Sequence, residues 1–149
     1  MELSENLPLN THILADLIET KDDMLLVWPD AKYPFCHDQW RTTLNPDKGH
    51  RSLLVYLAGR CIAHAALIKA RLPRRYKLSF FYVVPEMRYR GIGQEVIELL
   101  EDYAREKLTA QRLDLNVRTY NPAALRCYEK SGFREMGREG SLVKMSKRL

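Results

Sequence analysis

The stretch RYRGIGQ, residues 88–94, joins a run of aromatic and β-branched residues to the clearest helical pattern in the chain. The run before it, KLSFFYVV at 77–84, predicts a strand that ends at Pro85. After Gly91, apolar residues recur at steps of three and four, which predicts a helix with one apolar face. A helix that begins after a glycine turn presents free N–H groups and a positive partial charge. This junction therefore favours an anionic ligand.

Two familiar phosphate-binding motifs do not fit this loop. The Walker loop requires Gly-Lys-Ser or Gly-Lys-Thr, and the chain contains neither. The dinucleotide fingerprint requires a third small residue where this chain has Val96, and an acid at the end of the next strand, whereas Asp114 lies inside that strand. What remains is a loop whose main-chain N–H groups bind an anion, with Gly91 and Gly93 leaving room for its approach. A plain glycine turn before a surface helix is the alternative.

A strand and a second helix follow in the sequence. LDLNVRT at 113–119 alternates apolar and polar residues, which predicts a half-buried strand. NPAALRCYEKSG has helix signals at both ends, with Asn121 as the cap, Pro122 in the first helical position and Gly132 as a left-handed stop. SLVKMSKRL at 141–149 predicts a last strand. The order strand, helix, strand in this half indicates parallel pairing.

The first half of the chain predicts helices and then an antiparallel hairpin. Residues 9–24 have helical spacing, with Asn10 or Thr11 as the cap. Residues 51–70 predict two strands that meet at Gly59. The two halves together predict an α/β fold with a mixed, mostly antiparallel sheet flanked by helices.

The bulk composition limits the class of protein. With 149 residues, 46% of them hydrophobic and 29% charged, the chain is expected to form one domain over residues 1–149. No apolar run reaches the length of a membrane span, and no basic and then apolar leader opens the chain. Three widely spaced cysteines indicate a reducing cytoplasm and not a disulfide framework. The net charge of +5 favours an anionic partner.

Two linked sequence blocks make the chain resemble a known family. VVPEMRYRGIGQEVIELLEDYA, residues 83–104, followed by LDLNVRTYNPAALRCYEKSGF, residues 113–133, is similar to the GNAT superfamily of acyl-CoA-dependent N-acyltransferases. R-x-x-G-x-G in the first block resembles the pyrophosphate signature of that family, and the second block resembles its other motif in order and separation. The resemblance covers residues 51–149 well and implies a GNAT-like fold.

The resemblance implies that acetyl-CoA is the co-substrate, and it implies which residues hold it. Main-chain groups of Val83 and Val84 would pair with the pantetheine arm as an added strand does, and Asn121 would contact the same arm. The N–H groups expected to hold the pyrophosphate belong to Arg88, Tyr89, Arg90, Gly91, Ile92, Gly93 and Gln94.

Tyr128 is the general acid that the resemblance implies. An amine that attacks a thioester gives a tetrahedral intermediate, which then expels a thiolate. A phenol with a pKa of about 10 can donate a proton to a thiolate with a pKa of about 8.5 when the two are close. The alternative is a tyrosine that only packs its helix onto the sheet. We interpret the neighbouring Cys127 as a small packing residue and not as an acyl carrier.

The sequence departs from the family at the general base, where many members carry a glutamate. Asn116 stands at one such position, and Lys77 and Ser79 stand near the other. The remaining candidates are Glu86, Asp114, His64 and a chain of water molecules. No metal is expected, because Cys61 and His64 would point to opposite faces of one strand.

The residues that bind the acceptor are expected in the first third of the chain. There, Trp28, Asp30, Tyr33 and Phe35 combine an aromatic wall with one acid, which suits a cationic amine. A hydrophobic clamp between the helices and the sheet explains the same aromatic residues equally well.

These features predict an N-acetyltransferase that moves an acetyl group from acetyl-CoA to a primary amine of a small molecule or peptide, by direct attack in a ternary complex. A catalytically weak acyl-CoA-binding sensor and a basic nucleic-acid-binding module are the alternatives. The nucleic-acid alternative lacks the interleaved aromatic and basic residues of an RNA-recognition motif. We expect a cytoplasmic monomer or homodimer, with no membrane partner.

Overall fold

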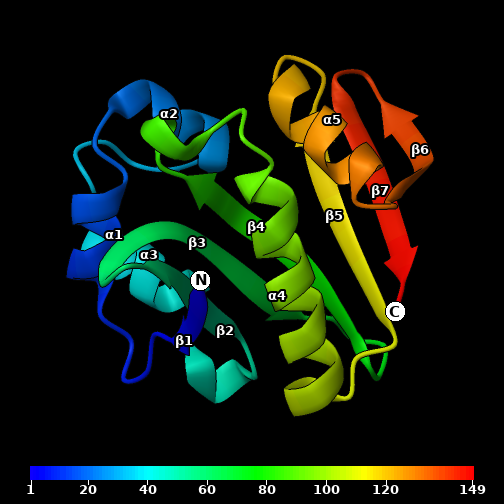
Figure 1. Ribbon diagram of the computed structural model, residues 1–149, viewed down its shortest axis with the longest axis horizontal. Coiled ribbons are helices and arrows are strands. Elements are labelled where there is room, and N and C mark those ends of the chain that lie inside the picture. The colour runs from blue at the N-terminus through cyan, green and yellow to red at the C-terminus, as the bar shows by residue number, and fades with distance from the viewer.

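The computed structural model describes residues 1–149 and contains a seven-stranded sheet in the order β1-β2-β3-β4-β5-β7-β6 (Figure 1). The strands are β1 (Glu2–Glu5), β2 (Arg51–Leu57), β3 (Arg60–Lys69), β4 (Arg75–Val83), β5 (Arg112–Arg118), β6 (Arg134–Glu139) and β7 (Leu142–Arg148). The helices are α1 (Thr11–Leu17), α2 (Lys21–Val27), α3 (His37–Thr43), α4 (Ile92–Leu108) and α5 (Pro122–Lys130), with short 3-10 turns η1 (Pro46–Lys48) and η2 (Pro85–Met87). The mixed, mostly antiparallel α/β class that the sequence predicts is confirmed.

The β4–β5 pair is the one parallel pair of neighbouring strands. α4 connects the two strands as a crossover, as a parallel pair requires. The other pairs are antiparallel. The predicted β2–β3 hairpin turns at Ala58 and Gly59, whose φ angles of 50° and 80° suit the two-residue turns that follow the twist of the strands.

Helices cover both faces of the sheet. α4 and α5 lie in front of it in Figure 1. On this side Phe81 of β4 contacts Tyr128 of α5, with ring centroids 5.8 Å apart. Its neighbour Phe80 instead contacts Trp40 of α3, with ring centroids 5.4 Å apart. The apolar core therefore has two layers, one under α4 and α5 and one under α1 to α3.

The N-terminal region differs from the prediction in two ways. The strand β1 was not predicted, because its sequence ELSE lacks strand-forming residues; it pairs with β2 at the edge of the sheet. The predicted helix over residues 9–24 is two helices, since Ile18 has extended dihedrals and Thr20 begins α2 by accepting from the N–H of Asp23 at 3.1 Å. Asn10 is the cap of α1, as predicted.

The C-terminal half follows the sequence signals closely. α4 begins at Ile92, directly after Gly91 in a left-handed conformation. Gly132, with a φ of 95°, lies just beyond the end of α5, and Pro122 is its first residue. Asn121 precedes α5 but makes no capping hydrogen bond with its side chain. No helix is both long enough and apolar enough to cross a membrane.

Candidate active site

The sheet forks between β4 and β5. The two strands pair only through Arg75–Lys77 and Arg112–Asp114, at their first residues. Beyond that point β4 continues to Val83 and β5 to Arg118 without pairing, and the two ribbons separate toward the upper end of Figure 1. Main-chain groups on the facing edges of both strands are therefore available to a ligand, as at any free strand edge.

A bulge in β4 accompanies the fork. Ala66 is opposite Ser79 and His64 is opposite Tyr82, so Phe80 and Phe81 together face one residue of β3. Phe80 has a φ of 53°, a left-handed value that is strained for a bulky residue. A bulge of this kind bends the strand that carries it. The bend in β4 thus lies where the strand leaves β5.

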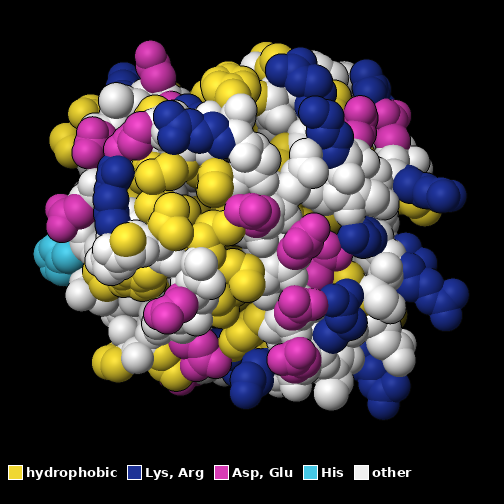
Figure 2. All heavy atoms as spheres, in the orientation of Figure 1, with side chains coloured by type: hydrophobic (Ala, Val, Ile, Leu, Met, Phe, Trp, Pro, Cys, Tyr) yellow, Lys and Arg dark blue, Asp and Glu magenta, His cyan; other side chains and the backbone are white.

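The predicted anion-binding loop connects β4 to α4. Tyr89 and Gly91 have positive φ angles, of 63° and 77°, and the first turn of α4 has no side-chain cap. A Cβ placed on Gly91 would meet no heavy atom within 4 Å, so the space beside it is open. Figure 2 shows Lys and Arg side chains near the upper end of this face, over the β4–α4 connection and over α5. Free N–H groups, the helix dipole and these charges all favour an anion here.

The two glycines of the loop do different things. A Cβ on Gly93 would lie 2.9 Å from Sγ of Cys127 on α5, closer than van der Waals contact permits. Gly93 therefore lets the start of α4 pack against α5, whereas Gly91 provides the left-handed turn and the open space. Both glycines were predicted to leave room for a ligand, and the space beside Gly91 is open as that role requires.

Main-chain groups at the end of β4 divide between the sheet and the fork. The N–H of Val84 donates to the carbonyl of Ile62 at 2.9 Å and so belongs to the sheet. The carbonyl of Val83 accepts from Nε of Arg88 at 2.8 Å. A carbonyl has two lone pairs, so Val83 can accept a second hydrogen bond. Of these two residues, Val83 is the one whose main-chain carbonyl does not bond to β3.

Arg88 ties the loop to α2. Its guanidinium donates to Oδ2 of Asp23 at 3.2 Å and lies 5.2 Å from the centre of the Tyr82 ring. The Tyr82 hydroxyl donates to the same carboxylate oxygen at 3.0 Å. Burial, and then this hydrogen bond, raise the pKa of Tyr82. The Arg88 side chain is thus held by protein groups, and no sequence pattern indicates its partner, because Asp23 lies 65 residues away.

Tyr128 points from α5 toward the fork. Its ring lies between Phe81 and Phe133, with centroids at 5.8 and 5.9 Å. Burial raises the pKa of this phenol, and Cys127 adds to the effect, but no hydrogen bond contributes. The enclosed side-chain polar atoms without a partner are Trp40 Nε1 and Ser131 Oγ, so the unpaired Tyr128 hydroxyl is not sealed inside the protein. A protonated phenol with a free hydroxyl is the state that a proton donor needs.

The two carboxylates considered as general bases each form an ion pair with an arginine. Asp114 accepts from Nε of Arg75 at 2.5 Å and from Ser146 at 2.7 Å. Burial raises its pKa, but these two hydrogen bonds and the positive charges of Arg75 and Arg112 together lower it below the usual value. Glu86 forms an exposed ion pair with Arg60, which holds its pKa below the usual value. Neither group is poised to accept a proton near neutral pH.

Lys77 and Asn116 face each other at the base of the fork. With its amide oriented to satisfy both groups, Asn116 accepts from Nζ of Lys77 at 2.8 Å. Burial and the nearby Lys144 lower the pKa of Lys77. The two positions at which the resemblance expects a glutamate therefore hold an amide and an amine that bind each other. Among the described residues, no group of three or more His, Cys, Asp or Glu side chains could hold a metal ion.

The four residues proposed for the acceptor separate into two pairs. Trp28 meets Trp40 edge-on and Phe35 stacks on it, at 4.9 and 5.3 Å between ring centroids, and both belong to the layer under α1 to α3. Asp30 and Tyr33 are exposed. Nζ of Lys21 lies 5.6 Å from the centre of the Tyr33 ring. The aromatic residues thus do not form one continuous wall.

An open hollow lies on the other side of α2. It has a volume of ≈ 440 Å³ and is lined by Asp22, Leu25, Leu26, Pro29 and Tyr120. Tyr120 belongs to the connection between β5 and α5, so the hollow joins α2 to the free end of β5. Leu26 and Tyr120 are 42% and 57% exposed, which leaves an apolar surface with one carboxylate. The sequence analysis missed these residues, because nothing in their spacing brings Tyr120 to α2.

A forked α/β sheet with a buried tyrosine, and with a loop whose geometry favours an anion, is typical of a protein that binds an extended, phosphate-bearing ligand. The chain matches the description "Acetyltransferase (GNAT) family" over residues 15–133. That match covers well over half of the chain. The protein therefore belongs to the GNAT acetyltransferase family and is an acyltransferase.

Solved structures with the same fold include several N-acetyltransferases. Spermidine N-acetyltransferase from Vibrio cholerae, in complex with CoA and spermine, is 20% identical with a TM-score of 0.79, over 99% of this chain and 94% of that one. The GNAT domain of S. lividans PAT is 17% identical with a TM-score of 0.80, over 99% and 89%. Campylobacter jejuni N-acetyltransferase PseH, in complex with acetyl coenzyme A, is 20% identical with a TM-score of 0.72, over 99% and 97%. At these identities the likeness concerns the fold.

Proposed function

We propose that this protein transfers an acetyl group from acetyl-CoA to a primary amine, by direct attack within a ternary complex. The observation that carries the proposal is the fork between β4 and β5 with the unpaired hydroxyl of Tyr128 beside it. The fork gives an extended ligand a free strand edge, and the phenol gives its reacting end a proton donor. The structures of related fold that contain CoA or acetyl coenzyme A support this use of the fork.

The donor would lie along β4 and end at the loop before α4. The pyrophosphate fits the open space at Gly91, next to the N–H groups of residues 88–94. The pantetheine would pair with the outward main-chain groups of Val83, and Asn121 stands across the fork at the start of α5. Val84 supports this placement indirectly, by fixing β4 to β3.

The transfer itself needs little from the side chains. The nitrogen lone pair of a neutral amine forms the new C–N bond at the thioester carbon, and the tetrahedral intermediate then breaks the C–S bond. Tyr128 donates its hydroxyl proton to the leaving thiolate. The proton lost by the amine nitrogen leaves through water, because no free carboxylate stands at the position of Asn116. Cys127 makes no covalent intermediate in this scheme, since burial raises its pKa and keeps the thiol protonated.

The hollow beside α2 is the proposed entry for the acceptor. Its apolar lining suits a hydrocarbon or aromatic substituent, and Asp22 at its rim favours a positive charge. Asp30 and Tyr33 remain candidates for contact with a larger acceptor, such as a peptide, because both are exposed. Trp28 and Phe35 would then act from beneath, by holding α2 in place.

The test is a screen of primary amines and peptide N-termini with acetyl-CoA, in which release of the CoA thiol is measured and the product is identified by mass spectrometry. We expect thiol release that depends on the amine, with no burst of acetylated enzyme. Thiol release in a burst without amine would show a ping-pong route and contradict direct transfer.

A catalytically weak acyl-CoA sensor is the second candidate, favoured by the Lys77–Asn116 pair that stands where a glutamate is expected. A sensor would gain thermal stability from acetyl-CoA by mass action but would release no thiol with any amine. A nucleic-acid-binding module would gain stability from oligonucleotides and none from acetyl-CoA. The two measurements therefore separate all three functions.

A further inference from the structure

We propose that His64 is a positioning residue for acyl-CoA binding, because it holds the bulge of β4 in the conformation that opens the fork. The imidazole is completely buried on β3, in the middle of the sheet. Its Nδ1 lies 2.9 Å from the carbonyl oxygen of Phe80, the residue with the left-handed φ. It therefore bonds the main chain at the bend itself and not at a distance from it.

The hydrogen bonds determine which ring nitrogen of His64 carries the proton. A carbonyl oxygen only accepts, so Nδ1 must be the donor to Phe80. Nε2 is then the acceptor for the Ser52 hydroxyl, 2.8 Å away. Burial lowers the pKa of His64 to about 4, so the ring stays neutral and keeps these roles at ordinary pH. The imidazole is a fixed donor to the bulge and does not act as a proton acceptor for the amine.

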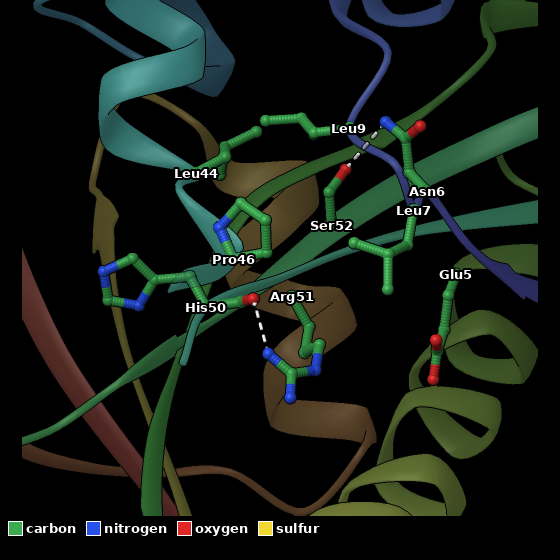
Figure 3. Close-up of a pocket in the computed structure, with 9 residues that line it drawn as sticks. All are labelled: Glu5, Asn6, Leu7, Leu9, Leu44, Pro46, His50, Arg51 and Ser52. Atoms are coloured by element: carbon green, nitrogen blue, oxygen red, sulfur yellow. Dashed lines mark hydrogen bonds between the residues drawn. The ribbon is translucent and has the colours of Figure 1, made fainter. Parts of the chain in front are cut away.

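A second residue holds the ring in this orientation. The Ser52 hydroxyl also accepts from Nδ2 of Asn6 at 3.2 Å, and Asn6 in turn accepts from the N–H of Asn10. Figure 3 shows the Asn6–Ser52 bond at the wall of a small cavity of ≈ 10 Å³. The chain of hydrogen bonds thus runs from the cap of α1 to the bend of β4. Asn6, Ser52 and His64 are buried, so breaking a link between them leaves a buried polar group unsatisfied.

The conformation of Phe80 determines which ring β4 directs to each face of the sheet. Its ring is directed to Trp28 and Trp40, at 4.9 and 5.4 Å, while the next residue, Phe81, is directed to Tyr128. Without the bond from His64, the left-handed conformation at Phe80 still costs free energy, and only the packing of its ring offsets that cost. β4 would then relax toward a regular strand, which moves Phe81 and the outward groups of Val83 away from the fork. Affinity for acetyl-CoA falls as a result.

The inference rests on the proposed use of acetyl-CoA, and two substitutions of equal shape test it. His64→Asn keeps an N–H donor where Nδ1 stands, whereas His64→Leu has nearly the same outline without the donor. Isothermal titration with acetyl-CoA should give the Leu variant a dissociation constant about tenfold above the parent, and the Asn variant one within about threefold, because an unpaired buried carbonyl is the difference. Hydrogen exchange over β4 should be faster in the Leu variant. The exposed His12→Gln is the control for loss of a histidine and should bind as the parent does.

Packing alone predicts the opposite order, since leucine fills an apolar interior better than asparagine. Equal affinity in the Leu variant and the parent, or equal loss in both variants, would overturn the inference. A parent that binds no acetyl-CoA would instead refute the proposed function. If the Leu variant does not fold, Ser52→Ala gives the same test, because it frees the ring to turn: affinity about three- to fivefold weaker supports the role, and unchanged affinity rejects it.

Discussion

The two sides of the candidate site are built on different principles. On the donor side, β4, the loop, α4 and α5 present main-chain groups, open space at Gly91 and a tyrosine hydroxyl without a partner. On the acceptor side, the region of α2 and α3 packs aromatic rings against the sheet, and Asp23 is already bonded to Tyr82 and Arg88. The donor side is prepared for a ligand of fixed chemistry. The acceptor side is a packed wall with a shallow hollow on its outer surface.

The difference between the sides explains why sequence motifs indicate residues for the proposed donor side and not for the proposed acceptor side. Main-chain binding depends on glycine and proline at set positions, and these residues have the same conformational consequences in any chain. Side-chain recognition depends on which rings pack inward, and that is decided by tertiary contacts. Arg88 and Tyr82 both bridge the two sides through Asp23.

The largest effect is expected on the donor side, from Tyr128→Phe. The change keeps the ring between Phe81 and Phe133 and removes only the proton donor. Turnover should fall by about a hundred- to ten-thousand-fold, as for loss of a positioned general acid, while the dissociation constant of acetyl-CoA changes little. Steady-state kinetics and calorimetry measure the two quantities.

Tyr76→Phe is the matched control for Tyr128, because Tyr76 is also buried but lies near the start of β4. It should leave turnover within a few-fold of the parent. A Tyr128→Phe enzyme that is less stable but turns over almost normally would show that Tyr128 only packs α5 onto the sheet. The donor side would then contribute main-chain groups for binding but no proton donor for the reaction.

The next effect separates the inner and outer surfaces of α2. Trp28→Ala removes a ring that contacts Trp40 and Phe80, so the free energy of unfolding should drop. The loss should stay below the about 3–5 kcal/mol typical of a fully buried tryptophan, because Trp28 is only partly buried. Leu26→Ala removes a side chain that is 42% exposed and lines the hollow, so stability should barely change.

Kinetics on the same two variants complete this test. Leu26→Ala should raise KM for the amine at constant kcat, whereas Trp28→Ala should act mainly through stability. If Trp28→Ala raised KM in a fully folded enzyme and Leu26→Ala did not, Trp28 itself would contact the acceptor. The hollow would then not be the acceptor entry.

The sequence predicted most of the fold, and it indicated the loop that we propose for the donor, for reasons that can be named. The helix after Gly91, the hairpin at Gly59 and the stop at Gly132 follow from conformations that glycine adopts readily. β1 was missed because an edge strand of four residues depends on its partner β2 and not on its own composition. The helix break at Ile18 was missed because no glycine or proline marks it.

Side-chain partners distant in sequence could not be predicted from patterns. The bond from His64 to Phe80, the tie from Arg88 to Asp23 and the meeting of Tyr120 with α2 all depend on tertiary contacts. The different surroundings of Gly91 and Gly93 could not be predicted either, because Gly93 faces Cys127 only when α5 packs against α4.

A smaller effect is expected from Gly91→Val, which tests the loop. A branched residue in a left-handed conformation costs about 1–2 kcal/mol, and its side chain would occupy the space proposed for the pyrophosphate. Acetyl-CoA should bind about tenfold more weakly or worse, as measured by calorimetry.

Gly140→Val provides the matched control for the loop. Gly140 also has a positive φ, of 57°, and open space beside it, but it lies in the β6–β7 turn. The two variants should lose similar stability in thermal melts, and only Gly91→Val should lose affinity. Equal affinity in both variants would remove the loop from the binding site.

The smallest effect is expected on the acceptor side, from Asp22→Asn. Asp22 is an exposed carboxylate at the rim of the hollow, in the first turn of α2. An exposed ion pair contributes little, so KM for a cationic amine should rise only about two- to fivefold, and less at high salt. KM for an amine without a second charge should not change. Asp16→Asn, which removes an exposed carboxylate from α1 outside the hollow, should leave both values unchanged. If the two aspartates had equal effects, the attraction would come from the general charge of the surface, and the acceptor side would have no specific contact at Asp22.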